Sequence, residues 1–453
     1  MRKKRFIQNM LGLSVSALLI RGVGMVWAVN AAQIMGAEML GRYRLIVSVY
    51  AFFLLAAAAG VSVTVTRLAG EELARGNEGA VSFIRSRAVS AAFCIGAALG
   101  VCMFIASFFL PAGFFGSGAA NALRVLSPAL PLAGFSSAVR GYFTARRKNL
   151  RNAAEQLIEQ LTELFVFIWS CRLLEGAGFS PIFCAALATT SAEAVSFIYS
   201  AALLCYDTRH TPPPEKISGL FPRARSVFVP CTASAGLRSA LSLAESCLIP
   251  AGLMVSAGNG GAAMEDFGII TGMALPCVMF PSVFILPAAQ LIVPELAAER
   301  ALGHKKAVMH MSKKLLRWTA GYSLLAMLPF LLFPYGISGL LGYPERAGFF
   351  IRLLAPLIPL SFIDSIVDGM LKGLDCQKSY FRINMIESVL RIIMALTLVP
   401  AFGASGAAAL IIAGELINAA LSLRRLQKEL RLNKAPPLST QRPIKKINLS
   451  VTP

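Results

Sequence analysis

Long apolar stretches alternate with short basic loops along this chain of 453 residues. A bilayer core about 30 Å thick is crossed by roughly 20 apolar residues in a helix. Strands do not account for stretches of this length, because an open sheet leaves backbone groups unpaired in lipid. The pattern therefore predicts an all-α integral membrane protein of about twelve transmembrane helices, at 7–33, 43–67, 82–110, 122–145, 154–173, 178–206, 226–256, 267–294, 315–340, 348–373, 380–402 and 405–424.

The basic residues gather on one side of the predicted membrane. The chain carries a net charge of +20, and most of its lysines and arginines fall in the N-terminus, in alternate loops and in the C-terminal segment. Because Lys and Arg are enriched in cytoplasmic loops, both termini are expected in the cytoplasm, with the protein in the bacterial inner membrane. The charge is therefore a topology signal, and no nucleic-acid partner is expected.

The remaining chemistry is sparse. Nine cysteines are scattered singly and the three histidines lie in predicted loops, so we expect no disulfide framework, no metal site and no cofactor. The chain shows no nucleophile–base arrangement and no phosphate loop, and an enzymatic role is not expected. The first apolar stretch is interpreted as an uncleaved helix, because it is too long for a signal peptide and carries Arg21 at its centre.

The two halves of the chain repeat one another. Residues 123–132 (LRVLSPALPL) align with residues 351–360 (IRLLAPLIPL) at an offset of 228 positions, and the same offset relates 65–71 to 293–299. Each half holds six spans, an even number, so the halves form parallel repeats in the membrane. We expect an N-terminal lobe at 1–206, a cytoplasmic connecting loop at 207–225, a C-terminal lobe at 226–425 and a basic cytoplasmic tail at 426–453.

Arginines at bilayer depth are candidates for substrate binding, because an ionisable residue there usually faces a cavity or a partner. Arg21 lies near the middle of the first span and Arg238 near the middle of the seventh. Each arginine lies in the first span of one half of the chain, so both are interpreted as cations of a central cavity for an anionic substrate. The alternative for each is a structural pair with a carboxylate. Arg44, at the outer start of the second span, either joins this patch or is an interfacial residue.

Arg140 is a fourth candidate cavity cation, near the cytoplasmic end of its span. Snorkelling to the headgroups or a structural pair is the favoured interpretation. The repeat places Asp368 at the equivalent site, which raises the hypothesis of an Arg140–Asp368 interaction across the pseudo-twofold axis. Arg391 follows Glu387 by four residues, the spacing of an ion pair within a helix.

Carboxylates within the spans are candidates either for ion coupling or for structural pairs. Glu163 is the deepest of a ladder that begins with Glu155 and Glu159, and Glu245 follows Arg238 by seven residues on roughly the same face. Coupling to H⁺, Na⁺ or the membrane potential would use such groups. The pattern does not choose among the six candidates, which are Glu163, Glu193, Glu245, Asp364, Glu387 and Glu415.

Short motifs in both halves carry a family resemblance: GAEMLGRY at 36–43, VTVTRLAGE at 63–71, RGYF at 140–143, EQLIEQ at 155–160, GMALP at 272–276, FPS at 280–282 and LKGL at 371–374. In their order and spacing they resemble the polysaccharide transporter, or oligosaccharide flippase, family of the superfamily that also contains multidrug and toxin extruders. The chain is most similar to stage V sporulation protein B-like proteins.

This resemblance implies a V-shaped, two-lobed helical protein that flips undecaprenyl-pyrophosphate-linked sugars. It also implies that cavity arginines, here Arg21 and Arg238, meet the pyrophosphate, whose geometry a guanidinium matches. Many relatives have fourteen spans, and in some of them the extra pair is associated with holding a lipid tail. This chain is predicted to have twelve.

Three functions are compatible with these observations. The first is a flippase for a lipid-linked oligosaccharide or peptidoglycan precursor, with the lipid-linked glycan, membrane lipids and glycan-assembly enzymes as partners. The second is a cation-coupled exporter of drugs or metabolites, which would have an acidic cleft rather than an arginine-bearing one. The third is a non-transporting scaffold for glycan-assembly enzymes, in which neutral replacements of Arg21 and Arg238 leave function intact.

Overall fold

The computed structural model describes residues 2–116, 118–174, 178–209, 211–215 and 219–432. Helices are the only regular secondary structure in these residues: α1 (Arg2–Ala74), α2 (Glu78–Ala106), η1 (Ser107–Phe109), α3 (Ala112–Phe115), α4 (Ala119–Leu126), α5 (Ala129–Ala145), α6 (Asn149–Leu174), α7 (Pro181–Thr208), α8 (Leu220–Ala257), α9 (Gly260–Gly268), η3 (Ile269–Ala274), α10 (Leu275–Met279), η4 (Phe280–Val283), α11 (Ile285–Ala301), α12 (Lys305–Leu332), α13 (Pro334–Leu340), α14 (Glu345–Leu354), α15 (Leu357–Gly373) and α16 (Gln377–Leu432). The predicted all-α class is confirmed. The predicted tail lies outside the described residues from position 433 onward.

The longest helices each provide two membrane crossings. Among the described residues, seven helices are long and apolar enough to span a membrane, and two bent pairs, α4 with α5 and α14 with α15, raise the number to nine. Two of the seven, α1 and α16, are broken at Gly36 (φ 69°) and Gly403 (φ 58°). This backbone conformation favours glycine, because it has no Cβ to clash. The predicted boundaries at 33–43 and 402–405 fall at these breaks.

The internal repeat has a structural counterpart. α5 and α15 begin and end 228 positions apart, at Ala129–Ala145 and Leu357–Gly373. Gly141 of α5 packs so tightly on α1 that an added Cβ would lie 2.6 Å from the Ser62 carbonyl oxygen. Gly369, its repeat partner on α15, meets the Ala289 carbonyl of α11 in the same way. The repeated glycines therefore mark one helix contact that each half uses.

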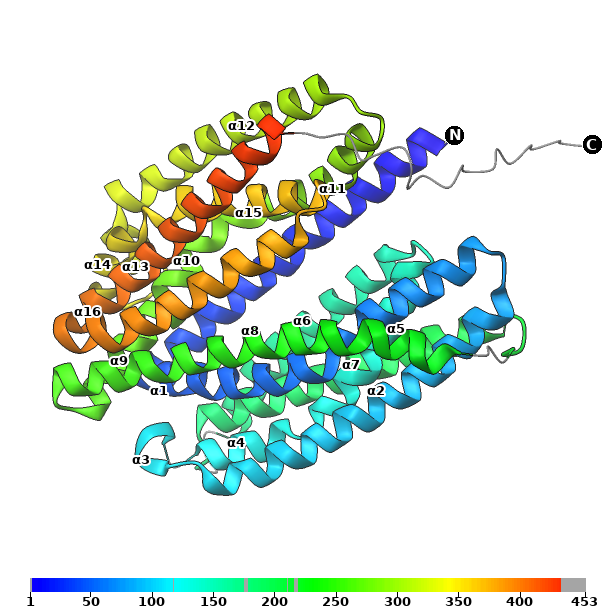
Figure 1. The fold of residues 1–453 in the computed structure, drawn as a ribbon. Coiled ribbons are helices and arrows are strands. Elements are labelled where there is room, and N and C mark those ends of the chain that lie inside the picture. Colours follow the sequence, from blue (N-terminus) through cyan, green and yellow to red (C-terminus); the bar gives the residue numbers. More distant parts are fainter. Residues whose placement is uncertain (1, 117, 175–177, 210, 216–218, 433–453) are drawn as a thin grey trace, which may run out of the picture.

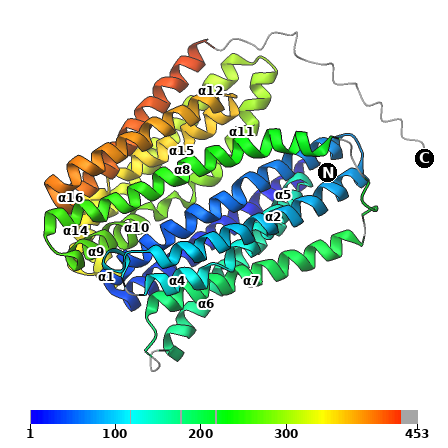
Figure 2. The same ribbon diagram turned by 60° about the horizontal axis from the view of Figure 1, so that its bottom comes forward.

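The helices form two groups that meet at one end and diverge at the other (Figure 1). The segment of α1 after Gly36 and α2–α7 make up one group, α9–α16 make up the other, and α8 runs between them (Figure 2). We call the diverging end the basic end; it holds the N-terminus and the turns at 75–77, 146–148, 302–304 and 374–376. The end where the groups meet is called the closed end.

Small residues bring the two groups into contact at the closed end. Gly41 of α1 faces the Met264 carbonyl of α9, and Gly268 of α9 faces the Ala37 carbonyl of α1, each too closely for a Cβ. The two contacts exchange when positions are shifted by 227, one fewer than the 228 of the sequence repeat, so this crossing lies on the pseudo-twofold axis. Leu40, Met264 and Phe267 are buried beside it in one apolar core. Small residues allow such close helix approach in membranes.

Ion pairs fasten the start of α8 to the first half at the basic end. Arg223 donates hydrogen bonds to Glu71 (2.9 Å) and Glu72 (3.1 Å) at the end of α1. Nearby, Asp207 accepts hydrogen bonds from the Tyr142 hydroxyl (2.6 Å) and the Lys148 ammonium (2.8 Å). The connecting segment is thus tied to the first half, although α8 also packs on α16 through Gly252 and Val399.

Candidate functional site

Arg21 and Arg238 occupy comparable places in the two halves. Arg21 lies near the middle of the segment of α1 before Gly36, and Arg238 lies near the middle of α8; both residues are exposed. Within the part of the chain that the structure describes, neither lies within 4.0 Å of a carboxylate oxygen. The structural pair considered for each from the sequence is therefore not formed in this structure.

Arg238 faces the interior of the second half. It lies two helical turns before Glu245, whose carboxylate bonds Arg391 of α16, so this face of α8 is directed at α16. The charge of Arg238 also acts on Asp368 of α15, as does that of Lys372. Arg238 therefore lies near half-buried Asp368, and no ion pair joins the two within the described chain.

Arg21 belongs to the face of α1 that approaches α6. One turn further along, a Cβ added at Gly24 would be in ordinary contact with α6, 3.5 Å from Gln160 Oε1. Arg21 itself is exposed. Its guanidinium is thus free to meet a partner that is not part of the protein.

Arg140 of α5 pairs within its own half. Its guanidinium lies 3.6 Å from Glu159 and 3.9 Å from Glu155, both of α6. Ser196 of α7 donates a 2.8 Å hydrogen bond to Glu155. No ion pair joins Arg140 to Asp368 among the described residues, so the hypothesis of a contact across the pseudo-twofold axis is wrong for this structure. The favoured interpretation, a structural pair, describes Arg140.

Two further carboxylates extend this first cluster. Glu163 accepts a 2.9 Å hydrogen bond from Thr189 of α7 and a longer one, 3.4 Å, from Gln160. Glu193 of α7 is buried, and Tyr50 of α1 lies beside it. The predicted ladder on α6 therefore faces α7 and α1, in the interior of the first half.

The second half holds a larger cluster. Arg391 binds Glu245 of α8 at 2.6 Å and Glu387 of its own helix at 3.3 Å, so the predicted in-helix pair is confirmed and extended to α8. Asp364 of α15 accepts a 3.0 Å hydrogen bond from Asn418 of α16, and both residues are buried. Glu415 lies one turn before Asn418 and interacts with Ser361. The candidates Glu245, Asp364, Glu387 and Glu415 thus lie together.

Both clusters contain more carboxyls than cations. In the first, Arg140 pairs with Glu155 and Glu159, while Glu163 and Glu193 have no ion pair among the described residues. In the second, half-buried Arg391 is the one cation among the described residues that pairs with the clustered carboxylates. Burying an unpaired charge is costly, so uptake of a proton or a monovalent cation would relieve each cluster. No group of three or more His, Cys, Asp or Glu side chains in the described residues has metal-site geometry.

Arg44 lies at the closed end of the molecule. It is half-buried there, next to Tyr43 along α1, and its Nε donates no hydrogen bond within the described chain. Its position beside the crossing of Gly41 and Gly268 separates it from the mid-helix arginines. It therefore belongs to the contact between the two halves rather than to a patch with Arg21 and Arg238.

Several polar residues of these clusters were not singled out from the sequence. Asn418 and Ser196 complete the hydrogen bonds of Asp364 and Glu155. An asparagine three positions after Glu415 in an apolar span is a readable signal, because a polar side chain at that depth needs a partner. Ser196 carries no such signal, since serine is common in membrane helices.

Sequence comparisons find related proteins whose alignments cover most of the chain. A profile of the family described as "Polysaccharide biosynthesis protein" matches residues 6–298. Stage V sporulation protein B of Bacillus subtilis (strain 168) is 21% identical over 452 residues, covering 96% of this chain and 86% of its own length. Sporulation protein YkvU of the same organism is 21% identical over 397 residues, covering 86% of this chain and 87% of its own.

Structural comparisons identify the fold. A MOP superfamily transporter from Pyrococcus furiosus superposes with a TM-score of 0.69 at 16% identity, over 94% of this chain and 96% of that one. An inward-facing multidrug resistance MATE family transporter of the same superfamily superposes with a TM-score of 0.68 at 15% identity, over 93% and 94%. The fold is therefore the multi-span helical fold of these transporters, with two lobes of six transmembrane helices.

Proposed function

This chain belongs to the polysaccharide biosynthesis protein family, and from that premise we propose that it is a flippase for a lipid-linked glycan. The substrate would be an undecaprenyl-pyrophosphate-linked oligosaccharide or peptidoglycan precursor. The membrane would be the bacterial cytoplasmic membrane, with the basic end and both termini in the cytoplasm, because Lys and Arg favour that side.

One observation carries the choice of an anionic substrate: Arg21 and Arg238 are exposed mid-helix cations without a carboxylate partner within salt-bridge distance in the described chain. An arginine at bilayer depth is costly unless it faces water or a partner. A pyrophosphate supplies that partner, since guanidinium groups bind phosphate oxygens in a bidentate manner. Arg140, in contrast, is already occupied by Glu155 and Glu159.

The arrangement of the halves supports alternating access. With the basic end in the cytoplasm, the two groups of helices would diverge inward (Figure 1) and meet outward at the crossing of Gly41 and Gly268. The lipid-linked head group would enter between the halves from the cytoplasm, bind Arg21 and Arg238, and leave outward after the halves rock. Such rocking about a fixed site is the general mode of transporters built from repeats. The acid-rich clusters would couple this motion to H⁺ or Na⁺, or to the membrane potential.

Complementation tests the proposal. A strain with a depletable lipid II flippase receives the wild type, Arg21→Ala or Arg238→Ala. Arg382→Ala is the matched control, because Arg382 is an exposed arginine at the basic end. Membrane levels are compared in every case. We expect rescue by the wild type and the control only. Rescue by all four chains would show that Arg21 and Arg238 do not form the substrate site. If the wild type also fails to alter the sidedness of a labelled lipid-linked sugar in liposomes, the flippase function is refuted.

The carboxyl clusters favour one alternative, a cation-coupled exporter of drugs or metabolites. Its substrates would be cationic and would bind the acidic groups rather than the arginines. A susceptibility panel on an overexpressing strain separates the two functions. Broad resistance that depends on Glu193 and Asp364, and not on Arg21 or Arg238, would favour export.

A further inference from the structure

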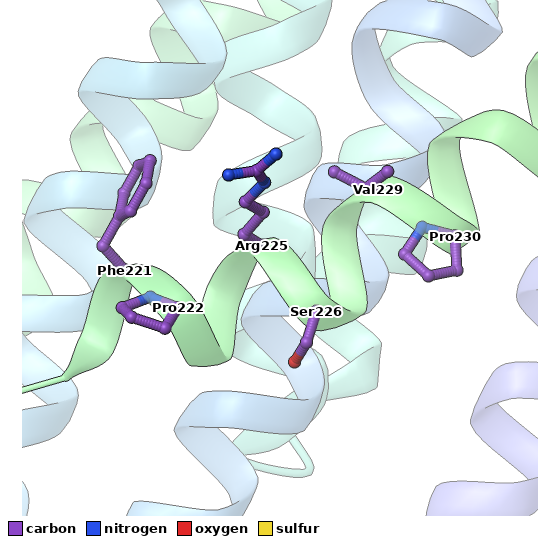
Figure 3. Close-up of a pocket in the computed structure, with 6 residues that line it drawn as sticks. All are labelled: Phe221, Pro222, Arg225, Ser226, Val229 and Pro230. Carbon is purple, nitrogen blue, oxygen red and sulfur yellow. The ribbon is translucent and has the colours of Figure 1, made fainter.

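A groove of about 930 Å³ lies at the basic end between α1, α2 and the first turns of α8. Its walls are mainly apolar and include Val61 and Leu68 of α1, Ile84 and Ile95 of α2, and Phe228 of α8. A smaller pocket of about 450 Å³ adjoins it and shares Phe221, Pro222, Arg225 and Val229. Figure 3 shows these first turns of α8, with the Arg225 side chain on the same side as Phe221 and Val229.

Two arginines line this groove without a carboxylate. Among the described residues, neither Arg225 of α8 nor Arg87 of α2 forms an ion pair, and the Arg87 guanidinium lies over the Phe83 ring, 5.5 Å from its centroid. A neighbouring arginine is paired instead. Arg223, two residues before Arg225, binds both Glu71 and Glu72. The five N–H donors of each guanidinium are therefore available to an anion at Arg87 and Arg225, but not at Arg223.

The charges and the apolar walls are separated along the groove. α2 leads away from the basic end, so Ile95 lies about 12 Å beyond Arg87 at 1.5 Å per residue. On α1, which runs the opposite way, Leu68 is near the basic end and Val61 is deep. The groove thus offers two cations toward the basic end and an apolar wall of roughly 10 Å beyond them. That is the pattern of an amphiphile with an anionic head and a hydrocarbon tail.

We propose that this groove binds an anionic glycerophospholipid of the bilayer, with its phosphate on Arg87 and Arg225 and an acyl chain along α1 and α2. The chain's own residues 433–453 do not fit, because their ionisable side chains are all basic. A lipid-linked glycan substrate is less suited, since the mid-helix cations Arg21 and Arg238 are not among the lining residues. A phospholipid here bridges α2 of the first half and α8, and so holds the two in the present arrangement.

Alkylation of Cys94 measures occupancy directly, because this exposed cysteine lines the groove. Cys102, exposed two turns further along α2 and outside the groove, is the internal control. Full-length variants that keep only Cys94 or only Cys102 are purified in detergent. Each is treated with a maleimide together with dioleoyl-phosphatidylglycerol, dioleoyl-phosphatidylcholine, inorganic phosphate or undecaprenyl phosphate.

Phosphatidylglycerol is expected to slow Cys94 labelling about tenfold at roughly ten times its Kd, by mass action, and to leave Cys102 unchanged. Arg87→Gln with Arg225→Gln should abolish this protection. Lys378→Gln with Arg382→Gln, which removes two exposed charges at the same end, should retain it. Native mass spectrometry should show one phosphatidylglycerol fewer on the groove variant.

Equal protection by phosphatidylcholine would overturn the proposal, as would protection that survives in the groove variant. Protection by inorganic phosphate alone would show a simple anion site, and protection by undecaprenyl phosphate alone would make the groove part of the substrate path; either result refutes a phospholipid site. Each variant is first checked for a monodisperse elution profile, so that loss of protection is not loss of fold.

Discussion

Adding one methyl group at Gly268 should open the closed end. An added Cβ would lie 2.8 Å from the Gly41 nitrogen and 2.9 Å from the Ala37 carbonyl carbon, and closer still to the Ala37 oxygen. Ordinary contact begins at 3.4 Å, so the Gly41 nitrogen alone requires α1 and α9 to separate by about 0.6 Å, and the closer Ala37 oxygen requires more. All of these neighbours are backbone atoms, which cannot rotate away as a side chain would.

The expected magnitude follows from overpacking, which costs typically about 1–3 kcal/mol. The cost falls only on the arrangement in which α1 and α9 cross this closely. The ratio of molecules that are closed at this end to molecules that are open there should therefore drop by a factor of about 5–150. A glycine-to-alanine change in a helix also gains about 0.8–1.0 kcal/mol of propensity, which a control must account for. Gly70→Ala, on α1 with no atom within 4 Å of its added Cβ, is that control.

Double electron–electron resonance on the full-length chain provides the assay. Spin labels replace Phe179 and Leu340, two exposed residues of different halves, in a background without the native cysteines. Gly268→Ala should broaden the distance distribution toward a second, shifted population, and Gly70→Ala should match the wild type. If Gly268→Ala leaves the distribution unchanged in a folded protein, the crossing does not decide which end is closed.

Further predictions follow from the clusters and the repeat. Arg140→Gln should lower thermal stability by less than the about 3–5 kcal/mol of a fully buried pair, because its side chain is 24% exposed. Adding Glu159→Gln should recover part of that loss, and purely additive effects would contradict the pairing. Gly141→Ala and Gly369→Ala should each lower the free energy of unfolding by about 1–3 kcal/mol, since both glycines meet a backbone carbonyl. Thermal melting of the two variants checks this. Destabilisation of only one variant would contradict the structural equivalence of the two glycines. Burial raises the pKa of the Cys376 thiol, and the negative charge of Glu429 raises it further. At about pH 7.5 it should therefore react with a maleimide more slowly than the exposed Cys94, and equal rates would contradict its burial.

Much of the architecture could be predicted because it depends on local or repeated properties of the chain. Apolar stretches of bilayer length define the spans, and the breaks of α1 and α16 at Gly36 and Gly403 fall within the predicted boundaries. The in-helix pair of Glu387 and Arg391 follows from helical spacing alone. Each of these needs no knowledge of which helix lies beside which.

The partners of the mid-membrane charges could not be predicted in the same way. Arg140 and Asp368 are repeat equivalents, yet Arg140 pairs with Glu155 and Glu159 of the following helix. A repeat identifies equivalent positions but not neighbours, because two points related by an axis can lie far from it. Glu245, likewise, bonds Arg391, which lies 146 positions away and on another helix.

The sequence by itself determined that this chain is a two-fold repeated bundle of membrane helices, since hydrophobic length, charge bias and internal similarity are written along one dimension. Only the tertiary structure decided which charges are neutralised and which are left free. Packing put carboxylates beside Arg140, Arg223 and Arg391 but none beside Arg21 and Arg225 in the described chain. An ion pair forms over about 4 Å, a distance that depends on how helices far apart in sequence are packed together.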